Sequence, residues 1–271
     1  IALWVLGGII AILGSFCYSE LSASYPRSGG EYHFLRLAYN ESVGFLSGWT
    51  SAFLGFAAPI AASAFAFSKY FTKVIDLNIS PKWVSIGVVL LITLIHTLKL
   101  KVGEQFQIVF TVGKVILICF FIIAGFRFHA SHPMDVSGLV HADFWKDINN
   151  SGFWIGLIFV SYAYSGWNAS TYIAGNLENP AKNLPRSLMI GTIIVTLIYL
   201  MLNGMFLSVA SFQELDGQND IGNVAALKIF GPHIGKIFSG IFSVALLSTL
   251  SATTIAGPRV GEAMGQDYPA L

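Results

Sequence analysis

Seven long runs of apolar residues dominate this sequence of 271 residues. Each is close to the roughly 20 residues that an α-helix needs to cross a bilayer. Hydrocarbon offers no hydrogen-bond partner to a backbone N–H or C=O group, so only helices and closed barrels can span it. Because no run alternates polar and apolar residues as a barrel strand does, the sequence predicts an all-α polytopic membrane helical bundle, a single transmembrane domain over 1–271. We place its seven spans near 2–20, 43–67, 83–98, 107–126, 153–173, 187–209 and 235–257.

The composition excludes several other classes of protein. Charged residues make up 11% of the chain, against roughly a quarter in a soluble domain. The net charge is +1 and no basic tract exists, so we expect no nucleic-acid partner. Without a nucleophile–base pair, a glycine-rich phosphate loop or paired carboxylates inside a span, the sequence predicts neither an enzyme nor a cofactor. We expect no metal site either: the cysteines sit inside apolar spans and three loop histidines lack a tight ligand spacing, namely Cys17, Cys119, His129, His132 and His141.

The two ends of the chain and its orientation give weaker signals. The sequence starts at Ile1 within an apolar run, without the charged segment and cleavage site of a signal peptide. We therefore expect a fragment that is truncated at both ends. Lys and Arg residues divide evenly between the two alternating sets of loops, seven against seven, so the positive-inside rule does not orient the chain.

One lysine remains after that count, and it lies inside a span. Lys114 is about a third of the way into the run near 107–126, with apolar residues on both sides. A charge at this depth costs a few kcal/mol or more, so such residues usually face a cavity and carry function. The alternative is that the long side chain reaches the membrane surface from one or two turns inside. We favour a functional role, as a proton carrier or as a fixed positive charge in a cation site.

The stretch SYAYSGWNAS, residues 161–170, places small and polar residues in the middle of a span. Gly166 weakens a helix, and Ser165 and Asn168 can bond to nearby backbone instead. An interrupted helix at membrane depth is tolerated only inside protein or beside a water-filled cavity, where its exposed backbone groups can hold a zwitterion or an ion. The alternative is close helix packing through small residues. Composition alone does not separate the two.

A similar cluster of hydroxyl residues lies at 248–254, in the last span. Hydroxyls spaced three or four residues apart can form one face toward a cavity. Serine and threonine in membrane helices more often bond the carbonyl of the preceding turn. Both interpretations stay open on composition, and the same holds for Asn203.

Three stretches together resemble the amino acid–polyamine–organocation superfamily, and within it the L-amino acid transporter-like permeases. They are CYSELSASYPRSGGEYHFLRLAYNESVGFLSGW at 17–49, YAYSGWNASTYIAGNLENPAKNLPRSL at 162–188 and SATTIAGPRVGEAMGQD at 251–267. The resemblance covers essentially the whole chain. It implies a fold of two five-helix inverted repeats, whose first and sixth helices are broken around the substrate.

In that alignment the seven spans match the family's helices two to eight. The resemblance implies that the first broken helix and the helices from nine onward are missing from this chain. It also implies that the loops holding Arg27, Lys99 and Pro185 face the cytoplasm.

The resemblance further assigns a substrate site to the unwound part of the sixth helix. Free carbonyl groups near Tyr162 and Ala163 would accept hydrogen bonds from the substrate's ammonium group. The ring of Tyr162 would act as a gate and add a cation–π contribution. Many relatives carry Phe at that position and Gly in place of Ser165, which bears on side-chain preference. The implied substrate-binding residues are Tyr162, Ala163, Tyr164, Ser165, Gly166 and Asn168.

An ion or proton site is implied on other helices. Lys114 matches a lysine of many sodium-independent members, whose ammonium group lies where sodium-coupled relatives hold an ion. Ser248, Thr249 and Ser251 align with the eighth-helix region that faces this place. Protons are therefore the expected coupling ion if the protein is not a plain exchanger.

The function that follows is secondary transport of amino acids, with neutral L-amino acids as substrates, at a site in the middle of the membrane. We expect a multi-pass protein of the plasma membrane, or of the inner membrane in a bacterium. One alternative is a polyamine or cationic amino acid carrier, which should show intramembrane carboxylates; only Glu20, at a span end, is available. A second alternative, from another class, is a seven-span receptor. Some eukaryotic relatives pair with a single-span glycoprotein through a loop cysteine, and the absence of such a cysteine argues against a heavy-chain partner.

Overall fold

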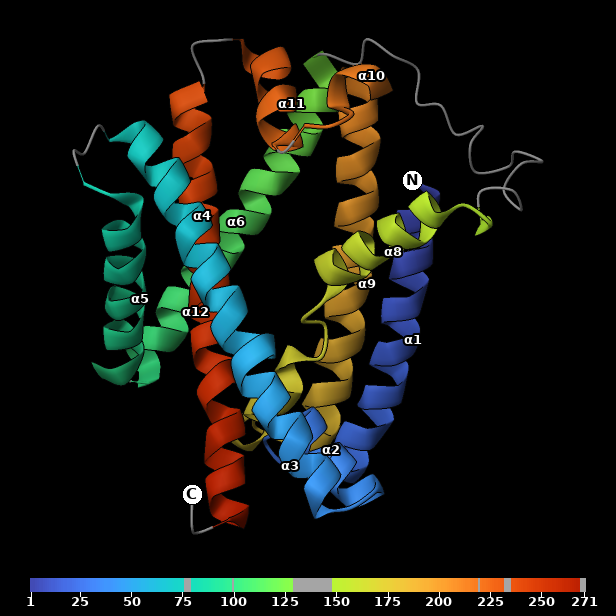
Figure 1. Cartoon of the computed structure of the whole chain (residues 1–271), viewed down its shortest axis with the longest axis vertical. Helices are drawn as coiled ribbons and strands as arrows, with labels where there is room; N and C mark the ends of the chain where they lie inside the picture. Colours follow the sequence, from blue (N-terminus) through green and yellow to red (C-terminus); the bar gives the residue numbers. More distant parts are fainter. Residues whose placement is uncertain (76–78, 99, 129–147, 219, 232–234, 269–271) are drawn as a thin grey trace. The chain divides into compact units, whose positions relative to one another are not determined.

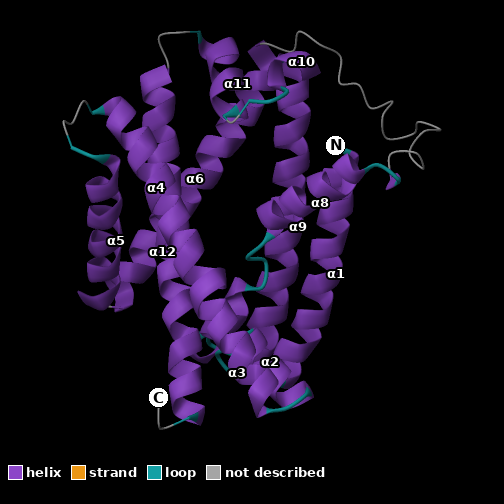
Figure 2. Cartoon of the chain, in the orientation of Figure 1, coloured by secondary structure: helices purple, strands orange, loops and turns teal. Residues whose placement is uncertain are grey.

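The computed structural model describes residues 1–75, 79–98, 100–128, 148–218, 220–231 and 235–268. These residues form helices joined by loops, and no strand occurs among them (Figure 2). The prediction of an all-α protein is therefore confirmed for the described chain. The three loop histidines that we weighed as metal ligands, His129, His132 and His141, lie outside the described residues.

Figure 1 shows the order of the helices along the chain. They are α1 (Ala2–Ser24), α2 (Glu31–Ala38), α3 (Glu41–Thr50), the π-helix η1 (Ser51–Ala57), α4 (Ala58–Val74), α5 (Pro81–Leu98), α6 (Leu100–Phe128), α8 (Ser151–Tyr164), the 3-10 helix η3 (Ala169–Asn176), α9 (Pro180–Val209), α10 (Phe212–Leu215), α11 (Ile221–Phe230) and α12 (Gly235–Asp267).

Five helical stretches of the described chain are long and apolar enough to cross a membrane. They are Ala2–Ser24, Glu41–Val74, Val102–Arg127, Pro180–Val209 and Lys236–Asp267. Two shorter helices, Pro81–Thr97 and Ile221–Phe230, are also apolar. The run that we placed at 153–173 is not one continuous helix, because α8 ends at Tyr164.

Two helices include prolines that we had placed outside the predicted spans. We expected a loop around Pro185, but α9 begins at Pro180 and includes Pro185. Likewise α12 continues through Pro258 to Asp267, ten residues past the expected end at 257. A proline inside a helix removes one backbone hydrogen bond. In both helices burial of the flanking residues outweighs that loss: Leu184 and Leu188 beside Pro185, and Ala256, Val260 and Ala263 beside Pro258.

The chain forms two compact units, which we describe separately. Unit 1 consists of Ile1–Arg27 and Ile122–Ile221, and unit 2 consists of Ser28–Phe121 and Gly222–Leu271. Unit 1 therefore contains α1, α8, η3, α9 and α10. Unit 2 contains α2 to α5, most of α6 and α11, and α12.

In unit 1, α1 and α9 run side by side over much of their length (Figure 1). Small and hydroxyl residues line their contact. The hydroxyl of Thr192 donates to that of Ser15 at 3.3 Å. A methyl group added at Gly8 would come within 2.6 Å of the side chain of Thr196. Close approach of the two backbones thus depends on small residues, as is common between membrane helices.

In unit 2, α4, α5 and α12 share one apolar core. It contains Ala64 and Phe67 of α4, Val88 and Ile92 of α5, and Leu250 of α12, each at most 8% exposed. Burying side chains of this size stabilises a fold by about 1.5–3 kcal/mol each. The core therefore fixes α12 against α4 and α5 along the segment that carries the hydroxyl cluster.

A polar cluster ties the short helix α2 to the far end of α12. The guanidinium group of Arg36 is 2.6 Å from the carboxylate of Asp267 and 3.1 Å from that of Glu41. The hydroxyl of Tyr32, which is fully buried, donates to Asp267 at 2.8 Å. Burial, and then the hydrogen bond to Asp267 and its negative charge, raise the pKa of Tyr32 above its usual value. The ring of Tyr268 lies beneath Arg36, with 5.5 Å between the guanidinium carbon and the ring centroid.

Candidate functional site

The middle of SYAYSGWNAS is a break in a helix. Helix α8 ends at Tyr164, and Ser165 turns the chain out of helical conformation with φ −58° and ψ 151°. Gly166 follows with φ +92°, a region that side-chain-bearing residues rarely adopt. The chain becomes helical again at Ala169, as the 3-10 helix η3. The sequence left a break and close packing equally open, and the structure has the break.

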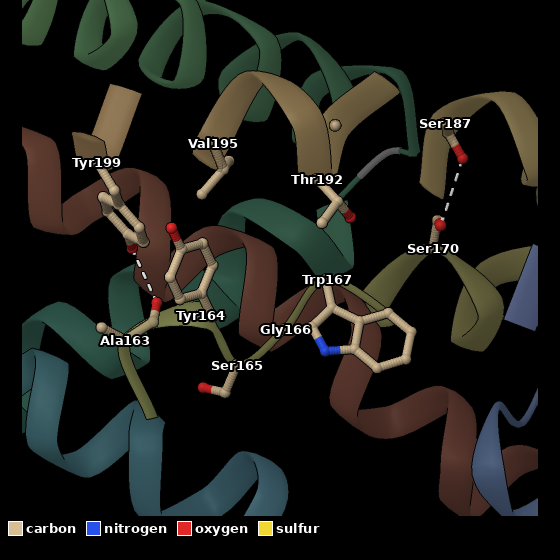
Figure 3. Close-up of a pocket in the computed structure, with 11 residues that line it drawn as sticks. Ala163, Tyr164, Ser165, Gly166, Trp167, Ser170, Ser187, Thr192, Val195 and Tyr199 are labelled. Atoms are coloured by element: carbon tan, nitrogen blue, oxygen red, sulfur yellow. Dashed lines mark hydrogen bonds between the residues drawn. The ribbon is translucent and has the colours of Figure 1, made fainter. Parts of the chain in front are cut away.

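A hollow of about 340 Å³ opens beside this break, entirely within unit 1 (Figure 3). One wall is the end of α8 and the break itself, together with Ser170 in the first turn of η3. The other wall is one face of α9. The lining residues are Ala163, Tyr164, Ser165, Gly166, Trp167, Ser170, Ser187, Gly191, Thr192, Val195 and Tyr199.

The α9 wall has a regular spacing of four residues. Ser187, Gly191, Val195 and Tyr199 follow one another at this interval, which places them on one face of the helix. The hydroxyl of Ser187 bonds to the Leu184 carbonyl at 2.9 Å and lies 3.3 Å from the hydroxyl of Ser170. The spacing is visible in the sequence, but we did not relate it to the stretch 161–170. The α9 residues, Trp167 and Ser170 were therefore missed.

Three aromatic rings hold the end of α8 against α1 and α9. The ring centroids of Trp4, Tyr164 and Tyr199 lie 5.0–6.0 Å apart in tilted or edge-on pairs. The hydroxyl of Tyr199 donates to the carbonyl of Ala163 at 2.8 Å, and that of Tyr164 donates to the carbonyl of Trp4 at 3.0 Å. Pairs of this geometry contribute about 0.5–1.5 kcal/mol beyond burial, and each hydrogen bond about as much. The last turn of α8 is thus fixed from two sides.

Four of the six residues assigned to substrate by resemblance line the hollow: Ala163, Tyr164, Ser165 and Gly166. The other two do not. Tyr162 is 66% exposed, and Asn168 bonds through its carbonyl to the hydroxyl of Thr171.

The carbonyl groups that we expected to be free each accept one hydrogen bond. The N–H of Ser165 donates to Tyr162 at 3.0 Å, and Tyr199 donates to Ala163. The expectation of free carbonyls was wrong in this respect, because the tight turn at the break brings the next N–H back onto α8. A carbonyl oxygen has two lone pairs, so each can accept one further bond.

The hollow carries no formal charge. Its lining has no Asp, Glu, Lys, Arg or His residue, and its polar atoms are hydroxyls, an indole and backbone groups. Serines at positions 165, 170 and 187, with Thr192, supply the hydroxyls. Such a surface can bond to a neutral polar group, but it offers no carboxylate to balance a second positive charge on a ligand.

The second set of predicted residues lies in unit 2. Lys114 is on α6 and is partly buried, and within the described chain it forms no ion pair. It shares a face of α6 with Thr111 and Gln107, three and seven residues earlier. Gln107 donates to Thr111 at 3.0 Å, and the hydroxyls of Thr111 and Ser248 are 3.0 Å apart.

Two hydroxyls of α12 bond to neighbouring helices within the described chain. Ser248 bonds to Thr111 of α6, and Ser251 lies 2.8 Å from the ring nitrogen Nε2 of His96 on α5. Both serines are fully buried. Thr249 is partly buried and gives its carbonyl to the hydroxyl of Thr253. The structure thus brings Ser248 onto the face of α6 that carries Lys114, whereas Ser251 joins a contact that the sequence did not predict.

Asn203 keeps to its own helix. Its side-chain amide donates to the carbonyl of Tyr199, one turn earlier in α9, at 2.8 Å. Of the two interpretations that the sequence left open, this is the local one.

A broken apolar helix, among helices long enough and apolar enough to cross a bilayer, is typical of a polytopic membrane protein. Comparison with known proteins gives its family. The sequence matches the model of the amino acid permease family over residues 1–268, and the chain belongs to that family. The resemblance to the amino acid–polyamine–organocation superfamily is confirmed, and the relatives that the chain matches are transporters, not enzymes.

Several curated proteins are similar to this chain. Asc-type amino acid transporter 1 of Mus musculus is 29% identical, over 84% of this chain and 44% of that protein. The serine/threonine exchanger SteT of Bacillus subtilis (strain 168) is 29% identical, over 97% of this chain and 59% of that protein. Large neutral amino acids transporter small subunit 2 of Oryctolagus cuniculus is 28% identical, over 85% and 44%. The chain spans about half the length of the curated relatives it matches.

Proposed function

We propose that the full-length protein is a secondary transporter for neutral L-amino acids, which binds its substrate at the break between α8 and η3. The observation that carries this proposal is the uncharged hollow at a helix break whose backbone is held in place by Tyr199. Family membership supports amino acids as the substrate class. Alternating access would move the bundle containing α8 relative to the rest of the protein.

The ammonium group of the substrate would bind at the carboxyl end of α8. The last carbonyl groups of a helix carry partial negative charge, which favours a cation. The carbonyls of Tyr162 and Ala163 each keep one lone pair after their bonds to Ser165 and Tyr199. The side chain of the substrate would then face the hydroxyls and the indole of the hollow. Tyr162, which is exposed beside this end of α8, remains our candidate for the gate.

A neutral side chain fits this hollow better than a cationic one. A polyamine or cationic amino acid carries a second positive charge, which needs a nearby carboxylate when it leaves water. None of the lining residues is acidic, and Glu20 is exposed on α1. We therefore favour neutral amino acids over the alternative of a polyamine or cationic amino acid carrier.

Coupling to protons, if transport is not plain exchange, would involve Lys114 together with Ser248, Thr249 and Ser251. Its support is a lysine at membrane depth that forms no ion pair within the described chain, one turn from the link between Thr111 and Ser248. We expect Lys114→Ala to lose transport in liposomes, or to lose its dependence on pH. Lys82→Ala, at the start of α5, removes a lysine outside the long spans and serves as the matched control. Unchanged transport at every pH in Lys114→Ala would contradict this role.

We place the protein in the plasma membrane, as a multi-pass protein that functions without a covalently bound heavy chain. One relative is named a small subunit, which implies a partner for that protein. In this chain Cys17 lies within α1 and Cys119 within α6, so neither is in a loop of the described chain. Expression with and without candidate heavy chains, followed by nonreducing gels and surface labelling, tests this point.

The central experiment is competitive uptake by the purified full-length protein in liposomes. Radiolabelled alanine or serine is taken up against a panel of neutral, cationic and acidic amino acids and putrescine. We expect neutral L-amino acids to compete, while lysine, arginine and putrescine do not. Competition by the cationic compounds alone would favour the alternative carrier, and no uptake of any amino acid would refute the proposed function.

A further inference from the structure

His96 contacts two other helices of unit 2 from the last turn of α5. Its Nε2 atom is 2.8 Å from the hydroxyl oxygen of Ser251 on α12. On its other side the ring fills the space beside Gly103 of α6, where an added methyl group would overlap Nδ1 of His96. The ring of Phe106, also on α6, stands perpendicular to the imidazole with 6.4 Å between centroids. His96 is thus wedged between α6 and α12, and the wedge fits because residue 103 is glycine.

The bond to Ser251 is one of two polar links that hold the middle of α12. Ser248, one turn earlier, makes the other link through Thr111 of α6. Both serines are buried, so their hydroxyls cannot exchange these partners for bulk water. Of the two links only the one to His96 contains a group that titrates near neutral pH.

In the tautomer that carries its proton on Nδ1, protonation of the imidazole reverses the direction of the bond between His96 and Ser251. In a neutral imidazole one nitrogen donates and the other accepts, so Nε2 can accept the hydroxyl proton of Ser251. In an imidazolium both nitrogens donate. Ser251 must then turn its own proton elsewhere, and the usual acceptor for a serine in a helix is the carbonyl of the preceding turn. The ordinary pKa of histidine places this change between about pH 5 and 8.

We propose that His96 is a pH-responsive positioning residue, whose gain of a proton reverses the hydrogen bond to Ser251 and changes how the middle of α12 is held. Its place in the last turn of α5 puts it near the end of an apolar helix, where water is within reach of a side chain. The proposal concerns the packing of unit 2, so it can be tested independently of the proposed transport.

His96 forms no ion pair with the charged groups of α6 and α12 within the described chain. On α6 the exposed Glu104 directly follows Gly103 and is the ionisable residue of the described helix nearest in sequence to this contact, and Lys114 follows about three turns later. On α12 the first ionisable residue after Ser251 is Arg259, eight positions further on, and it is paired with Glu262.

The other charged groups near α5 are lysines. The residues of α4 that pack against α5 in the shared core are apolar, and Lys69 and Lys73 lie over aromatic rings of α4 itself. Lys82 is at the opposite end of α5, over the ring of Trp83. Lys99 and the side chain of Lys101 lie outside the described residues. His96 is accordingly the titratable group of this contact within the described chain.

The first test compares the pH dependence of unfolding in wild type and His96→Gln. Glutamine can still bond to Ser251 but cannot gain a proton. Thermal unfolding of the full-length protein in detergent is measured between about pH 5 and 8. One titrating group can change the ratio of folded to unfolded protein by at most about tenfold per pH unit. We expect wild type to show a pH dependence of up to this size that His96→Gln lacks. Parallel profiles would overturn the proposal.

A matched pair of glycines on α6 tests the wedge. Gly103→Ala adds a methyl group against His96, whereas Gly113→Ala adds the same group where no heavy atom lies within 4 Å. We expect Gly103→Ala to lose the pH dependence of unfolding that comes from His96, and Gly113→Ala to keep it. A Gly103→Ala protein with the wild-type profile would overturn the geometry on which the proposal rests.

Two further measurements serve if one of these variants does not fold, and they also separate this proposal from the transport proposal. The NMR titration midpoint of one histidine side chain should differ between wild type and Ser251→Ala. An unchanged midpoint would overturn the proposal. Uptake by wild type and His96→Gln is compared across the same pH range. Absence of all amino acid uptake would refute the proposed function and leave the unfolding profiles to decide the role of His96. Normal uptake together with parallel unfolding profiles would refute only the proposed role of His96.

Discussion

Gly166 and Gly191 allow a direct test of whether the break in α8 requires its unusual backbone. Both residues line the same hollow, and a methyl group added at either would meet no heavy atom within 4 Å. The two positions differ in backbone conformation. Gly166 has φ +92°, whereas Gly191 lies inside α9. Alanine at both positions therefore changes the same chemistry in two backbone conformations.

The expected effects have opposite signs. Alanine at a positive φ outside its allowed regions costs about 1–3 kcal/mol of folding stability. Alanine in place of glycine inside a helix stabilises by about 0.5–1 kcal/mol, because the unfolded glycine loses more entropy. The two variants should therefore differ by roughly 1.5–4 kcal/mol, with Gly166→Ala below wild type and Gly191→Ala above it.

Thermal unfolding of the full-length protein in detergent measures this difference. A change of 1 kcal/mol shifts the midpoint by about 2–4 °C for chains of this size. We expect Gly166→Ala to unfold several degrees below wild type and Gly191→Ala a few degrees above it. If Gly166→Ala were as stable as Gly191→Ala, the break would not depend on a left-handed residue, and our account of a fixed break would be refuted.

Three other predictions concern single side chains. Tyr199→Phe keeps the aromatic contacts but removes the bond to Ala163, so we expect a loss of about 0.5–1.5 kcal/mol in unfolding free energy and weaker substrate binding, measured by denaturation and by uptake kinetics. Asp267→Asn leaves Arg36 without its nearer carboxylate; since the pair is partly exposed, we expect a loss of about 1–3 kcal/mol, and a loss near zero would show that the cluster does not hold α2. The raised pKa of Tyr32 means that its contribution to stability is present below its unfolded pKa of about 10 and is lost as pH rises further. Between about pH 9 and 11, around the unfolded pKa of tyrosine, wild type should therefore lose more stability than Tyr32→Phe. Thermal unfolding at these pH values checks this difference.

The sequence was sufficient for the helical class, because long apolar runs predict membrane helices from local chemistry. Glycine and serine in the middle of a run left a break and close packing equally open, and only the family resemblance favoured the break. The ends of helices were harder. Pro185 and Pro258 look like stops, yet both lie inside helices, because buried apolar neighbours outweigh one missing backbone bond. That balance depends on tertiary packing, which the local sequence does not contain.

The composition of the hollow could not be predicted from the stretch 161–170 alone. Five of its eleven lining residues come from α9, which is separated from the break along the chain. Tyr199 contacts Ala163 across 36 positions of sequence, and His96 contacts Ser251 across 155. Such partners are fixed by how helices pack, and only the spacing of four residues on α9 was available as a signal.

The position of a hydroxyl relative to a helix determines whether it is available to a ligand. Within continuous helices these hydroxyls bond to the preceding turn: Ser19 to Ser15, Thr196 to Thr192 and Thr254 to Leu250, at 2.7–2.8 Å. Ser165 differs because it lies at the helix break, where its ψ of 151° carries the following chain out of helical conformation. Within the described chain its hydroxyl has no hydrogen bond, and it lines the hollow. A helix break thus frees a side chain that a helix would have occupied, and among the hydroxyls of the described chain Ser165 is our candidate for a contact with the proposed substrate.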